Sequence, residues 1–208
     1  MMAARQLPLP LPQHGGRRKG AGRKPKGPRS LVSHKPRAPF EKPLPAHVTL
    51  RVGEHVWNLR SGRSYRRLKG CLAAAAGRFG LRVIAFSIQG NHLHLIVEAN
   101  DTEALSRGMQ GLCIRMAKAL NAMMRRSGRV FADHYHSRLL RSPSEMVSAI
   151  AYVLNNHRHH HEGGGVDRYS SAALDDAERA KLLSRPVGWL LRVGWRRAKR
   201  LDLRRTKA

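Results

Sequence analysis

The feature that most constrains the fold is a pair of consecutive apolar strands near the middle of the chain. The stretch "LRVIAFSIQGNHLHLIVEA" contains two runs rich in β-branched and large apolar residues, joined at Gln89-Gly90-Asn91. A short polar turn containing glycine, flanked by such runs, predicts two adjacent strands. Helical patterns on both sides of this pair then limit which elements can pack against the strands.

The flanking segments predict a recurring α+β arrangement. Residues 47–52 predict a strand, residues 61–80 a helix with a serine start and a glycine stop, and residues 100–128 a long helix with apolar residues every three or four positions. Residues 128–140 predict a fourth strand. The order β-α-β-β-α-β is that of a ferredoxin-like, split β-α-β antiparallel sheet with helices on one face. We expect the other face to be free for a site or a nucleic acid, and an additional helix to follow.

The charge of the chain indicates a polyanionic partner. Its formal net charge is +27, from 40 Lys and Arg against 13 Asp and Glu, so nucleic acid is the first candidate and an anionic membrane its rival. The chain has no run of about 18 apolar residues, the least that would predict a membrane-spanning helix. The opening "MMAARQLPLPLPQHGG" lacks the apolar region of a signal peptide. We therefore expect a cytoplasmic, nucleoid-associated protein with no membrane partner and no small-molecule substrate.

Composition divides the chain into three expected parts. Residues 1–44 hold 11 Lys and Arg against one acid, Glu41, and predict a flexible basic arm that binds phosphates. Residues 45–161 have the globular pattern and form the expected catalytic domain. Residues 162–208 form a basic C-terminal extension, in which aromatic and apolar residues alternate with arginines. Cys71 and Cys113 lie among apolar neighbours, which indicates small buried side chains in a reducing compartment rather than zinc ligands.

Two histidines share one face of the second strand of the central pair. Because side chains alternate along a strand, the apolar residues between them face the helical core, and His92 and His94 face away from it together with Glu98. Neutral imidazole is a good ligand for divalent ions, so the pair predicts two ligands of a metal site. Half-buried polar residues without a ligand role are the other interpretation of the pair.

The last predicted helix presents a tyrosine away from its apolar side. "SPSE" predicts the start, with Ser142 as N-cap, Pro143 in the first turn and Glu145 closing a capping box. At 100° per residue, Tyr152 and Asn156 lie together on nearly the opposite side from the apolar stripe. The stripe contains Met146, Val147, Ile150, Val153 and Leu154.

Together these side chains predict a metal-assisted attack on a phosphodiester. A divalent metal polarises the scissile phosphate, and a tyrosine oxygen attacks phosphorus to form a covalent phosphotyrosine. Asn156 offers a carbonyl oxygen as a third ligand beside His92 and His94. The stored bond energy allows a free 3′-OH to reverse the attack and rejoin strands.

These motifs resemble those of a known family. "GNHLHLIVEA" resembles the His-hydrophobic-His motif of HUH endonucleases, and "AYVLNN" resembles the helix of single-tyrosine transposases, which place Gln or Asn four residues after the nucleophile. Further similarity to REP-associated tyrosine transposases lies in "HVTLR", in "GRVFADHYHSRLLRSPSEMVSAIAYVLNNHRHH" and in "GWLLRVGW", and covers roughly residues 45–195.

The resemblance implies roles for individual residues. It implies His92, His94 and Asn156 as ligands of Mg²⁺ or Mn²⁺, Tyr152 as the nucleophile, and single-stranded DNA near a hairpin as the substrate. Many relatives continue the tyrosine helix with "NP", whereas this chain has "NNHRHH", so the turn that follows is expected to differ.

Other residues could serve in the same roles. Tyr135 also lies among histidines, but in a strand-like stretch without an amide four residues on, so it is expected to support the core or contact DNA. Glu98 is expected either to orient an imidazole or to lie at a solvated edge. Side chains of consecutive residues diverge around a helix, so the histidines after the tyrosine helix predict a solvated helix end rather than a metal site. They are His157, His159, His160 and His161.

Three function classes remain open from the residues. We expect a single-strand DNA endonuclease and strand transferase, that is, a transposase. The alternative is a basic nucleic-acid-binding module on the same fold, a class that includes ribosomal-type RNA binders. A replication initiator or relaxase is a third class, but these proteins need longer chains. A monomer is favoured and a dimer is possible.

Overall fold

A computed structural model of the protein describes residues 38–156 and 165–198. Most of the basic arm and the histidine cluster after the tyrosine helix therefore lie outside the described residues. Within the described ranges, no helix combines the length and the apolar character that crossing a membrane requires. The division of the chain into arm, catalytic domain and extension stays a prediction.

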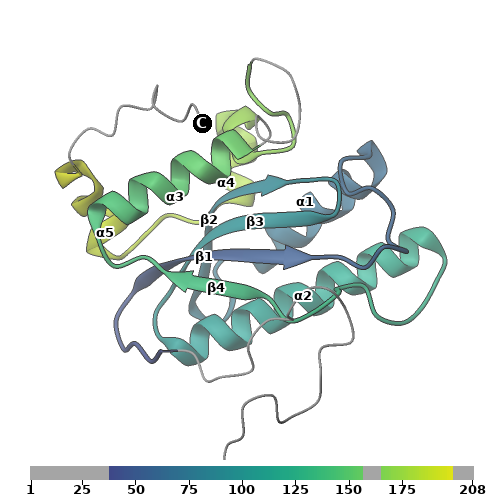
Figure 1. Cartoon of the computed structure of the whole chain (residues 1–208), viewed down its shortest axis with the longest axis horizontal. Coiled ribbons are helices and arrows are strands. Elements are labelled where there is room, and N and C mark those ends of the chain that lie inside the picture. The colour runs from purple at the N-terminus through teal and green to yellow at the C-terminus, as the bar shows by residue number, and fades with distance from the viewer. Residues whose placement is uncertain (1–37, 157–164, 199–208) are drawn as a thin grey trace, which may run out of the picture. The chain divides into compact units, whose positions relative to one another are not determined.

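Four antiparallel strands form the sheet at the centre of the fold (Figure 1). They are β1 (Leu44–Arg51), β2 (Leu81–Ile88), β3 (His92–Ala99) and β4 (His136–Leu139), in the spatial order β2-β3-β1-β4. Both central pairs are antiparallel, as is the pairing of β1 with β4. This arrangement confirms the predicted ferredoxin-like, split β-α-β fold. The fourth strand is much shorter than predicted, since only an isolated bridge between Val52 and Phe131 precedes it.

Two long helices cover one face of the sheet. They are α1 (Gly62–Ala75), capped by the Ser61 side chain, and α2 (Thr102–Met124), capped by the Asp101 side chain. The predicted apolar stripe of α2 is buried from Leu105 to Leu120, and it packs on the leucines and valines of β1 and β3. The contact is tightest at Gly108, where a Cβ would come within 2.4 Å of the Cβ of Leu81. Only glycine allows α2 to approach β2 this closely.

Both cysteines lie in this helical layer, as predicted. Cys71 is buried in α1, and Cys113 is partly buried in α2. Burial raises the pKa of Cys113 to about 12 and also raises that of Cys71. Both remain protonated thiols at neutral pH, and this makes them poor nucleophiles.

A smaller apolar cluster covers part of the opposite face. Helix α3 (Pro143–Asn155) lies there, together with the short helix α5 (Trp189–Arg192), on the side away from α1 and α2 (Figure 1). The expectation that this face is free is therefore wrong for part of its area. The cluster is made of Ala85, Ile96, Leu140, Met146, Val153, Leu190 and Leu191.

The predicted start of α3 is confirmed. The Ser142 hydroxyl accepts a hydrogen bond from the Glu145 backbone N–H at 3.2 Å, and a Glu145 carboxylate oxygen accepts from the Ser142 N–H at 3.1 Å. Hydrogen bonds from the Arg141 backbone and the Arg138 side chain hold the pKa of Glu145 below its usual value. This capping box fixes where the helix begins, and so fixes which residues of α3 face the sheet.

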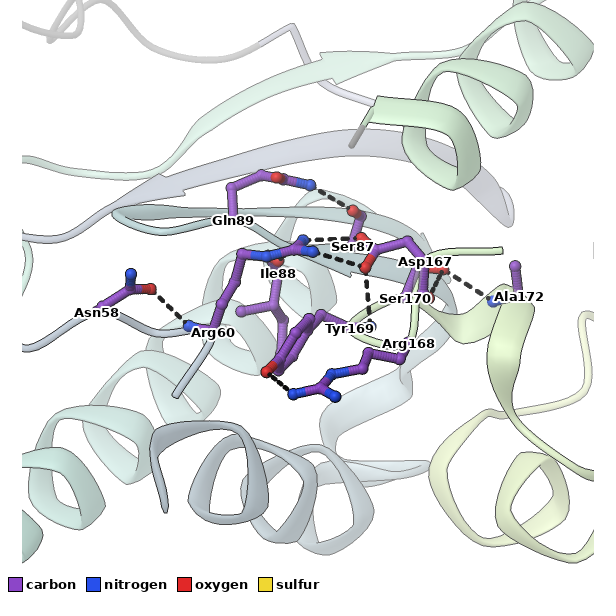
Figure 2. A network of polar contacts seen from close by, with 10 residues as sticks. All are labelled: Asn58, Arg60, Ser87, Ile88, Gln89, Asp167, Arg168, Tyr169, Ser170 and Ala172. Atoms are coloured by element: carbon purple, nitrogen blue, oxygen red, sulfur yellow. Dashed lines mark hydrogen bonds and ion pairs between the residues drawn. The ribbon is translucent and has the colours of Figure 1, made fainter. Parts of the chain in front are cut away.

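A polar network attaches the C-terminal segment to the edge of β2 (Figure 2). Arg60 forms a two-pronged ion pair with the buried Asp167, with both N–O distances at 2.9 Å, and it donates to the Ile88 carbonyl at 3.2 Å. The Arg60 guanidinium lies 4.4 Å from the centre of the Tyr169 ring. The Ile88 N–H donates to the Tyr169 carbonyl at 2.9 Å, so this segment extends the sheet irregularly beyond β2. Helix α4 (Asp176–Leu182) follows it.

The capping box gives a direct test of α3. Ser142→Ala removes the side-chain acceptor and is expected to lower the free energy of unfolding by about 1 kcal/mol, measured by urea denaturation. Ser144→Ala is the matched control, because Ser144 is exposed in the same helical turn; its expected change stays within about 0.5 kcal/mol. Equal losses from the two variants would contradict the cap.

Candidate active site

Strand register gathers polar side chains on the sheet face that carries α3. Thr49 of β1 and Ser87 of β2 both pair with His94 of β3, and directly paired residues of antiparallel strands share a face. Thr49 also pairs with His136 of β4. The core face of the same strands is apolar, so this alternation separates the polar side chains from the main core.

Three imidazoles and the Tyr152 ring lie against one another at the boundary between β1, β3 and α3. The ring centres of His92 and His94 are 4.9 Å apart, and those of His47 and His94 are 5.2 Å apart. The Tyr152 ring meets the His94 and His47 rings edge-on at 5.3 Å and 5.7 Å. Tyr152 nevertheless keeps 43% of its surface exposed, whereas His94 keeps 5%. The structure thus brings together three of the four predicted site residues.

The hydrogen bonds of the predicted ligand histidines favour metal binding through Nε2. His92 Nδ1 lies 2.8 Å from the side-chain oxygen of Asn91, which can only accept, so His92 carries its proton on Nδ1. His94 Nδ1 lies 3.1 Å from His47 Nε2 and 3.2 Å from the Thr49 hydroxyl. Metal-bound histidines commonly use one ring nitrogen in this way and ligate with the other.

His47 is the site residue that sequence reasoning missed. Burial, then the charges of His136 and Arg138, lower its pKa below 6.5, so it is a neutral imidazole at pH 7. The signal was present in "HVTL", because His47 and Thr49 alternate with the core residues of β1. The pairing of β1 with β3 brings His47 to His94, and this pairing cannot be read from the sequence alone.

Asn156 lies at the C-cap of α3, one helical turn after Tyr152, and is fully buried. Its side-chain oxygen and nitrogen both lack a hydrogen-bond partner among the described residues. Leaving a buried amide unsatisfied costs about 1–3 kcal/mol, and metal coordination would satisfy its oxygen. That Asn156 binds the same metal ion as the two histidines stays a prediction.

The donor set fits a divalent metal ion. Within the described ranges, no three His, Cys, Asp or Glu side chains are arranged to hold one. A third protein ligand would therefore come from another residue type, and the orphaned amide oxygen of Asn156 is of the kind that Mg²⁺ and Mn²⁺ accept.

The rival nucleophile lies on the other side of the sheet. Tyr135 directly precedes β4 and packs against the core formed with α1 and α2. It also lines a cavity of about 800 Å³ together with Cys113 and Asp133. The predicted supporting role for Tyr135 agrees with this position, and its ring is separated by the sheet from the cluster of imidazoles.

Both interpretations of Glu98 are wrong. Its side chain is fully buried, and its carboxylate accepts from Arg82 Nε at 2.7 Å and from the backbone N–H groups of Val187 and Gly188, each at 2.8 Å. A Cβ at Gly188 would come within 2.6 Å of a Glu98 oxygen, so only glycine fits there. Glu98 therefore anchors the chain before α5. The neighbouring sequence does not predict this role, because the two backbone groups that Glu98 binds lie about 90 positions away.

Arginines border the imidazoles on the same face. Arg51 pairs with His92 at the end of β1, and Arg138 pairs with His47 from β4. Arg138 also forms an ion pair with Glu145 at 2.8 Å. Glu145 therefore offsets the charge of Arg138, whereas Arg51 leaves positive charge beside the imidazoles, which favours a phosphate-bearing substrate.

Glu98 offers a second test. Glu98→Ala leaves the largely buried Arg82 without its ion-pair partner and two backbone N–H groups without acceptors, and is expected to cost about 3–5 kcal/mol of unfolding free energy. Glu103→Ala breaks an exposed helix ion pair with Arg107 and is expected to cost under about 0.5 kcal/mol. Chemical denaturation of both variants checks this, and similar small losses would show that Glu98 is not an anchor.

A family model covers more than half of the chain. The family model described as "Transposase IS200 like" matches residues 44–156. A solved structure of a REP-associated tyrosine transposase bound to a REP hairpin has a TM-score of 0.58 at 12% identity, covering 76% of this chain and 100% of that one. A candidate transposase from Deinococcus radiodurans R1 has a TM-score of 0.42 at 15% identity, covering 63% of this chain and 100% of that one. No curated protein matches the chain.

Proposed function

The chain belongs to the IS200-like transposase family, and from this premise we propose that it cleaves and rejoins single-stranded DNA beside hairpins. Tyr152 is the nucleophile, and His92, His94 and Asn156 hold Mg²⁺ or Mn²⁺. The observation that carries the proposal is the contact between the Tyr152 ring of α3 and the His94 ring of β3, at 5.3 Å. Two elements far apart in sequence bring a hydroxyl-bearing side chain to the predicted ligands.

The chain's own residues supply the nucleophile and its surroundings. The partial exposure of Tyr152 lets a DNA strand reach it, while α3 holds the ring against His94 and His47. The two ligand histidines would coordinate through Nε2, because their Nδ1 atoms bond to Asn91, His47 and Thr49. A bound divalent ion would polarise the scissile phosphate and neutralise charge that develops on it.

The reaction exchanges one phosphodiester for another. The Tyr152 hydroxyl loses its proton and its oxygen forms a bond to phosphorus, while the bond from phosphorus to the 3′ oxygen breaks. The departing oxygen takes up a proton and becomes a free 3′-OH. The 5′ phosphate stays on the tyrosine, so attack by a 3′-OH restores a phosphodiester without ATP.

His47 acts through His94. Its Nε2 contacts His94 Nδ1 at 3.1 Å, the position at which a protein group commonly fixes the tautomer and the ring plane of a ligand histidine. The lowered pKa keeps His47 neutral, so it adds no positive charge beside the metal ligands at pH 7. His47 is a positioning residue.

The substrate assignment rests on charge and on the solved relative. Arg51 makes this face attractive to a phosphate backbone. The structural relative was solved bound to a REP hairpin, which supports a hairpin as the feature recognised. We further propose that residues 45–161 are the catalytic domain, with the basic arm and extension adding contacts to phosphates, and that the protein acts as a monomer.

A covalent adduct tests the nucleophile. Full-length protein incubated with Mn²⁺ and labelled hairpin DNA carrying single-stranded flanks is expected to form an adduct that survives denaturing electrophoresis. Tyr152→Phe should abolish it, and Tyr135→Phe should leave it within about threefold of wild type, because Tyr135 lies across the sheet. Loss with Tyr135→Phe alone would overturn the assignment. No adduct on any hairpin from the neighbouring genome would favour the alternative, a non-catalytic nucleic-acid-binding module.

Metal binding can be measured without catalysis. Electron paramagnetic resonance reports free Mn²⁺ directly, so a titration gives its Kd in the absence of DNA. His92→Ala, His94→Ala and Asn156→Ala should each weaken binding at least about tenfold, and His47→Ala about tenfold through His94.

Two controls complete this titration. His55→Ala removes an exposed histidine elsewhere, and Tyr152→Phe removes no ligand, so both should bind as wild type does. Unchanged affinity in Asn156→Ala would remove Asn156 from the ligand set while leaving the histidines in place.

A further inference from the structure

Four arginines converge on the side of the sheet that α3 does not occupy. They line a cavity of about 390 Å³ between α1 and the C-terminal end of α2. We call it the arginine pocket, and its lining residues are Arg63, Arg66, Arg67, Ala122, Met123 and Arg125.

This arrangement is electrostatically unfavourable on its own. Arg63, Arg66 and Arg67 are three and four residues apart on α1, and like charges at these spacings repel. Within the described ranges, none of the four arginines forms an ion pair with an acidic side chain. Arg125 adds a fourth charge from the C-cap of α2, at a φ of 52° where glycine is the usual residue. An anion bound between the helices would relieve the repulsion.

An exposed aromatic side chain lies beside the arginine pocket. Trp57 has 48% of its surface exposed, and the Arg63 guanidinium lies 5.7 Å from the centre of its ring. The Trp57 backbone N–H contacts Met124 Sδ at 3.5 Å, so the loop that carries the ring is attached to the end of α2. Phosphate-binding arginines next to an exposed aromatic face are the combination that holds single-stranded nucleic acid.

We propose that the arginine pocket and Trp57 form a second nucleic-acid site, in which arginines bind the phosphate backbone of a single strand and an unpaired base stacks on Trp57. The pocket is built on α1 and α2, whereas Tyr152 lies on α3 across the sheet (Figure 1). It therefore contacts a part of the DNA other than the scissile phosphate. The inference does not depend on Tyr152 being a nucleophile.

The test measures binding under conditions that prevent cleavage. Fluorescence anisotropy with full-length protein in EDTA gives the affinity for a single-stranded oligonucleotide and for a blunt duplex at several salt concentrations. The triple variant Arg63→Ala, Arg67→Ala, Arg125→Ala is expected to bind the single strand about 10- to 100-fold more weakly. Its salt slope should fall by about 2, since each lost phosphate contact removes about 0.7.

A matched variant distinguishes a specific binding site from a general effect of positive charge. Arg78→Ala, Arg107→Ala, Arg141→Ala removes the same charge from exposed positions outside the pocket and outside the C-terminal extension, and is expected to weaken binding less than about threefold. Equal losses from the two triple variants would overturn the pocket. Thermal unfolding of both confirms that each remains folded, and wild-type Mn²⁺ affinity would show that the active site is intact.

Trp57 tests the stacking part separately. Trp57→Ala should weaken single-strand binding at least about fivefold and leave blunt-duplex binding unchanged, whereas Trp57→Phe should retain most of the affinity. Equal effects of Trp57→Ala on both nucleic acids, or no effect on either, would overturn the stacking contact.

Discussion

The antiparallel register of β1 on β3 decides where the imidazoles of the candidate site lie. Opposite Thr49 stands His94, and opposite Arg51 stands His92, so one face of the strand pair carries the imidazoles and the other carries leucines and valines. A shift of one residue would turn the histidines into the main core and leave the leucines facing α3. The burial of the leucines in that core therefore holds the histidines in place on the opposite face, and the site depends on it.

Two apolar layers of unequal size give the molecule its functional asymmetry. The large layer under α1 and α2 stabilises the sheet, and the small layer under α3 and α5 fixes the helix that bears Tyr152. Buried Glu98 holds α5 in the small layer, because its carboxylate binds the backbone immediately before α5. The Tyr152 ring therefore packs against His47 and His94 on one side and stays partly exposed to solvent on the other.

Most of the fold was predictable because its local signals agree with its global arrangement. The turn at Gly90, the Ser142 cap and the apolar stripe of α2 each depend on neighbours within a few residues, and each was predicted. The irregularity in β2 between Val83 and Ala85 was not predicted. The sequence carries a sign of it, because the core-facing residues are odd-numbered up to Val83 and even-numbered from Phe86 onward. That shift keeps Phe86 on the core face after the interruption.

The candidate site was predictable only in part, because it joins residues from separate elements. His92, His94 and Tyr152 were identified from strand alternation and a helix wheel, and the structure brings their rings together. His47 escaped because its role requires strand pairing, and the anchoring role of Glu98 required a contact about 90 residues away. The arginine pocket combines a pattern visible on α1 with one residue from the end of α2, so the sequence alone does not assemble it.

Peptide mapping of the DNA adduct tests the central claim most directly. After trypsin digestion, cleavage at Arg141 and Arg158 releases residues 142–158, in which Tyr152 is the only tyrosine. Cleavage at Arg129 and Arg138 releases residues 130–138, which contain Tyr135. Mass spectrometry should find the nucleotide on the first peptide, attached through the oxygen of Tyr152. A nucleotide on the second peptide, or on any peptide without Tyr152, would contradict the account.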